Sequence, residues 1–312
     1  MDKTIYIVGH PNPDIDSILS SMLMKDILKN KGIGCECAVF ENDALNQEYI
    51  DIANLYGTYE PKVIKNNDIQ NHRYILVDHN DISTTIKNKN LISGIIDHHK
   101  NSGWEKRDNF VFTDRCSTTI AIYEFFKNEH QFTNEQKEQI LIGLAFDSKF
   151  GKSRKYELID ELLAKELNLD KMPEDLLQTY FVPSDISDDK ILMNDRKPIM
   201  IGNIKYESCS LMMDNQNAFG KLYKAIEKTN EKNFIGLISD INSETTSVII
   251  KENGEIKHLK HFDELYSRKE MEKDFENFIE NEQKIEKDEQ LRWFFLTSTV
   301  KVLVFPFFSF DF

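Results

Sequence analysis

Four short runs in the first half of the chain are mostly apolar and rich in β-branched residues: residues 5–8, 36–40, 74–77 and 92–96. Such runs predict buried strands. Apolar residues three and four positions apart, a spacing typical of helices, occur over residues 17–31, 46–56, 117–127, 134–145 and 157–167. Strand and helix in alternation predict an α/β fold, with a parallel sheet that carries helices on both faces.

The periodicity breaks at residues 182–189, where turn-forming residues replace the apolar pattern. After this break, strand-like runs occupy residues 199–204, 208–212, 234–238 and 247–250, and a helical pattern covers residues 218–227. We therefore expect a smaller α/β domain across an active-site cleft from the first. The predicted boundaries are residues 1–183 for the first domain, 184–190 for a linker and 191–292 for the second domain.

Residues 293–312 form an almost wholly apolar tail, interrupted by Lys301 and Pro306. A membrane span needs roughly 20 apolar residues without such interruptions. We favour a packed terminal strand or an aberrant tail over a membrane anchor, and the role of the tail stays open.

The formal net charge of -14 argues against nucleic acid as a partner, because binding a phosphate backbone normally needs a basic face. A compact anion remains allowed, since a metal cluster can invert the local sign of the charge. We therefore expect a small-molecule substrate, with no nucleic-acid partner and no membrane partner.

The four cysteines, at positions 35, 37, 116 and 209, show no zinc-type spacing. Reduced thiols in the core are the simplest interpretation. The N-terminus runs directly into a predicted strand, without the charged and apolar regions of a secretory signal. A cytoplasmic location is expected.

Candidate chemistry begins where the first strand meets the first helix, because residues 9–17 read Gly-His-Pro-Asn-Pro-Asp-Ile-Asp-Ser. In an open parallel sheet, ligands bind at the carboxyl ends of the strands. His10, Asp14 and Asp16 offer one imidazole and two carboxylates there, and two prolines stiffen the loop. Taken alone, Asp16 or Ser17 could instead be only the N-cap of the helix.

Two more strand ends carry similar residues. Asp78 follows the third predicted strand, and Asp97, His98 and His99 follow the fourth. A lone aspartate after a strand is often only a turn residue, whereas an acid followed by two histidines is difficult to explain by packing. The carboxyl ends of these strands should meet at one edge of the sheet, as a site for two metals requires.

Mixed imidazole and carboxylate ligands favour manganese or cobalt over a structural zinc. Two such cations can hold a bridging hydroxide as a nucleophile and neutralise the charge that develops on a phosphoryl oxygen. The sequence therefore predicts metal-dependent chemistry on phosphate.

The three strand-end segments, residues 9–18, 77–80 and 97–99, resemble the first three motifs of the DHH phosphoesterases. Their form is typical of the family II inorganic pyrophosphatases. Residues 146–148, followed by Lys152 and Ser153, resemble the fourth motif. The resemblance implies hydrolysis of inorganic pyrophosphate to two orthophosphates by a metal-bridged hydroxide at a dinuclear site.

The resemblance extends to residues 116–119, which are similar to a small-residue helix start, and to two segments that resemble the substrate-clamp motifs of a second domain, residues 194–197 and 267–269. It spans residues 5 to about 270. The implied cofactor is a pair of Mn²⁺ ions, with Co²⁺ or Mg²⁺ as alternatives and a further Mg²⁺ bound with the substrate. A homodimer is compatible with the family.

The resemblance also assigns residues to roles. Two metals are implied to share the bridging Asp78, with His10 and Asp14 on one ion and Asp16, His98 and Asp147 on the other. The implied catalytic residues are Asp78, His99, which contacts the substrate near the leaving group, and Asp97, which orients a neighbouring imidazole. The implied substrate-binding residues are Lys152, Lys197, Arg268 and Lys269, the last three on the phosphate that is not attacked.

Three alternative functions remain: two belong to other enzymes of the same superfamily, and one is not enzymatic. An exopolyphosphatase of the same superfamily would share the metal site and act on longer phosphate chains. A superfamily nuclease or cyclic-dinucleotide phosphodiesterase usually has a glycine-rich motif in the second domain, and glycine is scarce after residue 202. A catalytically inactive interaction protein on the same scaffold would be expected to lack a metal ligand, and all the implied ligands are present.

Overall fold

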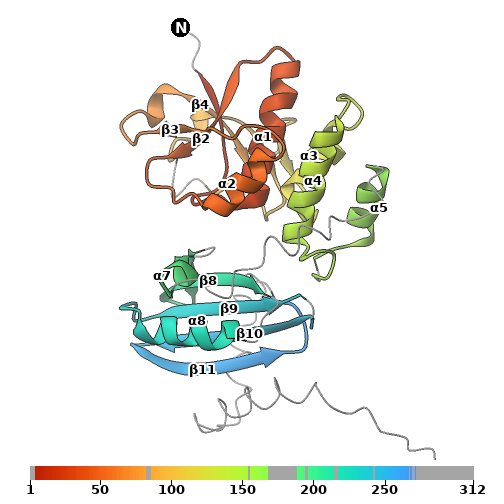
Figure 1. The fold of residues 1–312 in the computed structure, drawn as a ribbon. Coiled ribbons are helices and arrows are strands. Elements are labelled where there is room, and N and C mark those ends of the chain that lie inside the picture. Colours follow the sequence, from red (N-terminus) through yellow and green to blue (C-terminus); the bar gives the residue numbers. More distant parts are fainter. Residues whose placement is uncertain are drawn as a thin grey trace, which may run out of the picture. The chain divides into compact units, whose positions relative to one another are not determined.

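The computed structural model describes residues 4–81, 86–153, 155–167, 188–193, 196–213, 217–241, 243–266, 268 and 271. The chain forms two compact units, residues 1–181 and 182–312 (Figure 1). The predicted boundary at residue 183, the start of the linker at residue 184 and the apolar tail at 293–312 fall outside the described residues.

The first unit is built on a sheet of six strands in the order β3-β2-β1-β4-β5-β6, and every neighbouring pair is parallel. The strands are β1 (Ile5–Val8), β2 (Cys35–Phe40), β3 (Lys62–Ile64), β4 (Arg73–Val77), β5 (Ile92–Asp97) and β6 (Phe110–Phe112). Strands β2 and β3 lie on one side of β1, and β4, β5 and β6 lie on the other, so the strand order reverses between β1 and β4. Ligands of open parallel sheets bind beside such a reversal, at the carboxyl ends of the strands.

The described residues of this unit form five α-helices: α1 (Ile15–Asn30), α2 (Gln47–Asn54), α3 (Thr118–Phe126), α4 (Asn134–Asp147) and α5 (Leu158–Glu166). Helix α1 begins after Asp14, whose side chain accepts a hydrogen bond from the Ser17 amide at 3.1 Å. The N-cap is therefore Asp14, and the alternative that Asp16 or Ser17 serves only as the cap is wrong. Helix α4 begins with a reciprocal capping box between Thr133 and Gln136.

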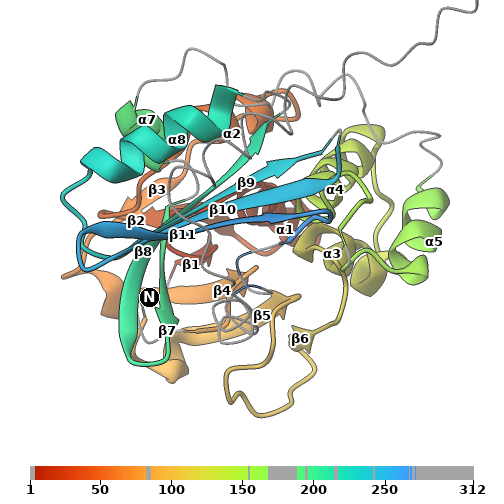
Figure 2. The same ribbon diagram turned by 90° about the horizontal axis from the view of Figure 1, so that it is seen from below.

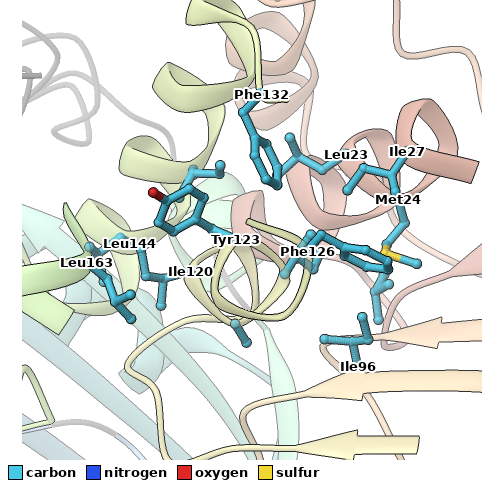
Figure 3. Packing of buried hydrophobic residues seen from close by; sticks show 14 of the residues in the cluster. Leu23, Met24, Ile27, Ile96, Ile120, Tyr123, Phe126, Phe132, Leu144 and Leu163 are labelled. Atoms are coloured by element: carbon cyan, nitrogen blue, oxygen red, sulfur yellow. The ribbon is translucent and has the colours of Figure 1, made fainter. Parts of the chain in front are cut away.

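Successive side chains along each strand point to opposite faces of the sheet, and apolar side chains are buried on both faces. One face packs against α1, α3, α4 and α5 through residues that include Leu23, Ile120, Phe126 and Leu144 (Figure 3). Each such side chain, once fully buried, stabilises the fold by about 1.5–3 kcal/mol. The other face packs against residues outside the α-helices, including Trp104. The predicted α/β class is confirmed.

The second unit contains a five-stranded mixed sheet in the order β11-β10-β9-β8-β7, in which only β8 and β9 are parallel. Its elements are α7 (Asp188–Met193), β7 (Lys197–Ile201), β8 (Ile204–Met213), α8 (Asn217–Lys228), β9 (Phe234–Asp240), β10 (Thr245–Glu252) and β11 (Glu255–Phe262). Helices α7 and α8 lie side by side (Figure 2). Gly236 allows α8 to approach β9 closely, because an added Cβ would lie 2.5 Å from Ile226 Cδ1.

One expectation for this unit needs correction. The predicted strand at 199–204 is a hairpin, in which Ile201 pairs with Ile204 across Gly202, whose φ is +57°. A two-residue turn with a positive φ is typical of such hairpins. Helix α7 begins at Asp188, within the segment 184–190 that is predicted to be a linker.

The four cysteines are buried and free of disulfides, as expected for reduced core thiols. None of the described helices combines the length and the apolar character needed to cross a membrane.

Candidate active site

Polar residues follow three neighbouring strands and lie close together where the strand order reverses. His10 follows β1, Asp78 follows β4, and His98 follows β5. The three remaining donors belong to helices, since Asp14 is the N-cap of α1, Asp16 lies in its first turn and Asp147 is the last residue of α4. Residues from five elements, far apart in the sequence, thus meet at one edge of the sheet.

Asp78 lies at the centre of this group and is only 2% exposed. Its φ of +55° is in the left-handed region, which is uncommon for a residue other than glycine. The backbone is held there by a hydrogen bond from its amide to the Ile96 carbonyl at 3.0 Å. Strain of this kind persists where the surroundings over-determine a conformation, and it is frequent at functional sites.

The two carboxylate oxygens of Asp78 face two different imidazoles. His10 Nε2 lies 3.5 Å from Oδ2, and His98 Nε2 lies 3.3 Å from Oδ1. Hydroxyl groups fix the carboxylate plane, because Ser17 Oγ donates to Oδ2 at 3.0 Å and Thr118 Oγ1 donates to Oδ1 at 3.1 Å. One carboxylate therefore borders two separate groups of donor atoms.

The structure brings together all six predicted metal ligands. Within each of two groups the candidate ligand atoms lie within 4.8 Å of one another: His10, Asp14 and Asp78 in the first, and Asp16, His98 and Asp147 in the second. These donors are imidazole nitrogens and carboxylate oxygens, the set that suits Mn²⁺ or a similar divalent cation.

Backbone carbonyls set the orientation of both imidazoles. His10 Nδ1 lies 2.9 Å from the Pro11 carbonyl, and His98 Nδ1 lies 3.2 Å from the Arg115 carbonyl. Since a carbonyl can only accept, Nδ1 must carry the proton in each ring. Each Nε2 then faces the carboxylates and is the nitrogen that would ligate a metal when the ring is neutral.

His99 is arranged differently. Its Nδ1 donates to Asp97 Oδ1 at 2.7 Å, and its backbone amide donates to the same oxygen at 3.0 Å. Asp97 is fully buried. Hydrogen bonding with His99 and the nearby imidazole charge outweigh the effect of burial, and they hold the pKa of Asp97 below its usual value. His99 Nδ1 also lies 3.5 Å from Asp78 Oδ1, and His99 forms a third candidate group with Asp78 and His98.

Asp16 is held by the beginning of α3. Its carboxylate accepts hydrogen bonds from the amides of Thr118 at 2.7 Å and Thr119 at 3.1 Å. The positive end of a helix dipole favours a carboxylate in this position. Gly143 on α4 makes the approach possible, because a Cβ there would lie 2.3 Å from Thr119 Oγ1 and 2.7 Å from Asp16 Oδ1.

The assembled carboxylates repel one another. Burial, the charge of Asp147 and the charge of Asp78 raise the pKa of Asp16 well above its usual value. Burial, reinforced by Asp14 and Asp78 and opposed by His98, raises the pKa of Asp147 to about 6. Divalent cations would relieve this repulsion, so the electrostatics of the site fit a metal centre as well as its donor atoms do.

Asp147 is unusual for a helix end, because an acid at the C-terminus of a helix is unfavourable next to the negative end of the dipole. The loop after it has left-handed backbone at three consecutive residues, Lys149, Phe150 and Gly151. Lys152 lies exposed in this loop.

In the second unit, two of the predicted substrate-binding residues converge on Ser208. Ser208 Oγ donates to the Lys197 carbonyl at 2.6 Å and lies 3.5 Å from Arg268 Nη1. Lys269 lies outside the described residues.

Sequence reasoning missed three residues that support the site: Ser17, Thr118 and Asn80. The first two hold Asp78, and Asn80 donates to Asp97. A hydroxyl residue directly after a ligand-rich loop was the available signal for Ser17. Thr118 lies in the segment that resembled a small-residue helix start, but its bond to Asp78 spans 40 positions and has no local pattern.

Metal-free protein should become less stable as the pH rises from neutral toward about 8. Burial lowers the pKa of His98, but hydrogen bonding to Asp78 and the charge of Asp147 outweigh it and raise the pKa from 6.5 to about 9. The folded state then binds more protons than the unfolded state in this window. Thermal unfolding in chelator should give a falling Tm, and His98→Gln should flatten the slope. A rising Tm in the unsubstituted protein would contradict this assignment.

Comparison with known proteins shows what this chain is similar to. Residues 4–146 match the model of the DHH family, N-terminal domain. A "Probable manganese-dependent inorganic pyrophosphatase" of Oceanobacillus iheyensis is 28% identical over 276 residues, covering 82% of this chain and 88% of that protein. A protein of the same name from Brevibacillus brevis is 28% identical over 218 residues, covering 66% of this chain and 69% of that protein.

The fold agrees with these sequence matches. A Methanococcus jannaschii protein, assigned provisionally to the family II inorganic pyrophosphatases, superposes with a TM-score of 0.70 at 21% identity, covering 85% of this chain and 96% of that one. This chain therefore carries a DHH-family N-terminal domain over residues 4–146, and the resemblance to the family II inorganic pyrophosphatases is confirmed.

Proposed function

We propose that this protein is a metal-dependent phosphoanhydride hydrolase that converts inorganic pyrophosphate to two orthophosphates. The observation that carries the proposal is the Asp78 carboxylate, whose two oxygens face separate groups of imidazole and carboxylate donors. The names of the similar proteins support the substrate and the preference for manganese. Cobalt and magnesium remain alternatives for the cation.

In this proposal His10, Asp14 and Asp78 hold one cation. Asp16, Asp78, His98 and Asp147 hold the other. When bound, two such cations activate water and neutralise charge on the phosphoryl oxygens. The carbonyls behind His10 and His98 keep each Nε2 aimed at its cation, and the α3 amides keep Asp16 in place.

His99 is proposed to contact the substrate near the leaving group. Asp97 fixes the ring through Nδ1, so Nε2 is the atom that reaches the phosphate. A protonated imidazole in this position can donate a hydrogen bond to the charge that develops on the leaving oxygen. Asp97, kept ionised by its hydrogen bonds, stabilises the positive ring and holds its direction.

Basic residues are proposed to bind the phosphate that is not attacked. Lys197, Arg268 and Lys269 would supply these contacts from the second unit, and Lys152 from the loop after α4. Arginine suits this role because its guanidinium can bind two phosphate oxygens at once. The proposal includes a cytoplasmic, homodimeric enzyme.

Phosphate release from pyrophosphate, tripolyphosphate and long polyphosphate, measured side by side, tests the function. Chelation should abolish activity, and added Mn²⁺ should restore it. Pyrophosphate should be the preferred substrate. Full activity in chelator, with metal content shown to be zero, would overturn the mechanism, and a preference for long polyphosphate would favour the exopolyphosphatase alternative. Metal binding without turnover would favour an inactive scaffold.

A further inference from the structure

Asn80 connects the loop after β4 to the loop after β5. The residue is 3% exposed, so its amide is removed from water. Its Nδ2 donates to Asp97 Oδ2 at 2.5 Å and to the Lys100 carbonyl at 3.1 Å. Its Oδ1 accepts from the Ser102 amide at 2.7 Å. One side chain thus uses both ends to bind the segment that carries His99.

The contact with Asp97 completes the hydrogen bonding of that carboxylate. Oδ1 accepts from the amide and from Nδ1 of His99, and Oδ2 accepts from Asn80. Rotation of the carboxylate would break bonds on both sides. The direction of the His99 ring is therefore tied, through Asp97, to the position of Asn80.

The backbone of Asn80 is anchored in turn to the core. Trp104 Nε1 donates to the Asn80 carbonyl at 2.7 Å, and the indole is only 7% exposed. Trp104 packs edge-on against Phe110, with ring centroids 5.2 Å apart, within the apolar cluster beneath the sheet. Asn80 therefore joins a rigid part of the fold to the polar edge of the site.

We propose that Asn80 is a positioning residue, which holds the Asp97–His99 pair in the orientation needed for His99 to reach the substrate. The inference rests on the proposed function. The hydrogen bonds of Asn80 go to Asp97, Lys100, Ser102 and Trp104, none of which is a proposed ligand of either cation. Its removal should leave the metals bound and the substrate recognised, while His99 loses its fixed direction.

The central experiment compares Asn80→Ala with Asn101→Ala. Asn101 is a matched control, because it lies in the loop after β5 that Asn80 binds and makes two hydrogen bonds to the backbone of Trp104, at 2.7 Å and 2.9 Å, without touching Asp97. Asn80→Ala should lower kcat by about 10- to 100-fold, the effect expected for loss of a hydrogen bond to a charged group, with KM changed little. Asn101→Ala should stay within about 3-fold of the unsubstituted enzyme.

Two further measurements separate positioning from general damage to the fold. In a background of His99→Gln, Asn80→Ala should cause no further loss of kcat beyond about 2-fold, because the residues act as one unit. In metal-free protein, nitrogen NMR of the histidines should give His99 with its proton on Nδ1, and Asn80→Ala should mix the two tautomers. If Asn80→Ala fails to fold, Asn80→Asp, which keeps the shape and the Oδ1 acceptor, replaces it.

Multiplicative losses in the double variant, or equal losses in Asn80→Ala and Asn101→Ala, would overturn the proposal. Undiminished kcat in Asn80→Ala would overturn it as well. These results require an active unsubstituted enzyme. Absence of pyrophosphate hydrolysis by that enzyme with Mn²⁺ would instead refute the proposed function, so the two failures are distinguishable.

Discussion

Asp78→Asn is expected to lower the turnover of pyrophosphate by about 100-fold or more relative to Lys152→Ala, because one change disturbs both cations and the nucleophile. Asparagine preserves the shape of the side chain and tolerates the left-handed backbone that Asp78 adopts at φ +55°. The loss of turnover would therefore result from removing the second carboxylate oxygen and not from a change in backbone strain. An amide nitrogen can neither coordinate a cation nor accept from Ser17 or Thr118.

Steady-state turnover and metal content should be measured together for this variant. Asp108→Asn, at an exposed position, is the matched control and should behave as the unsubstituted enzyme does. Asp78→Asn should also bind less Mn²⁺ per chain. If the variant kept normal turnover and normal metal content, Asp78 could not be the shared ligand.

The edge that gathers the candidate metal ligands was predictable because its residues lie where a local rule applies. His10, Asp78 and His98 each follow a strand, and parallel strands of one sheet end at the same edge. Asp147 follows no such rule. An acid at the end of a helix is ordinarily a surface residue, and only the resemblance to a known motif singled it out.

Sequence analysis missed other features because the segments are short or because the interacting residues lie far apart in the sequence. Strands β3 and β6 are three residues long, too short for an alternating pattern to be recognised. The turn at Gly202 lay inside an apolar run that was interpreted as a single strand. Asn80 contributes through Asp97, 17 positions away, and a partner at that separation leaves no local pattern.

Arg268→Ala is expected to reduce kcat/KM for pyrophosphate by about 10- to 100-fold, since each charged hydrogen bond to phosphate contributes about 1.5–3 kcal/mol. The reduction for tripolyphosphate should be smaller. If Arg268 and its neighbours close on a terminal phosphate, a third phosphoryl group must occupy the space that these cations fill. Arg268 Nη1 and the backbone carbonyl of Lys197 both contact Ser208 Oγ, so the two residues are neighbours in the second unit.

Measuring both substrates shows whether Arg268 selects for the length of the phosphate chain. Lys257→Ala is the control in the same unit, because Lys257 is paired with Glu255 at the exposed surface and should leave both substrates unaffected. Equal losses on both substrates would favour a site that does not select for length, as an exopolyphosphatase requires. No loss on either would mean that Arg268 takes no part in binding phosphate.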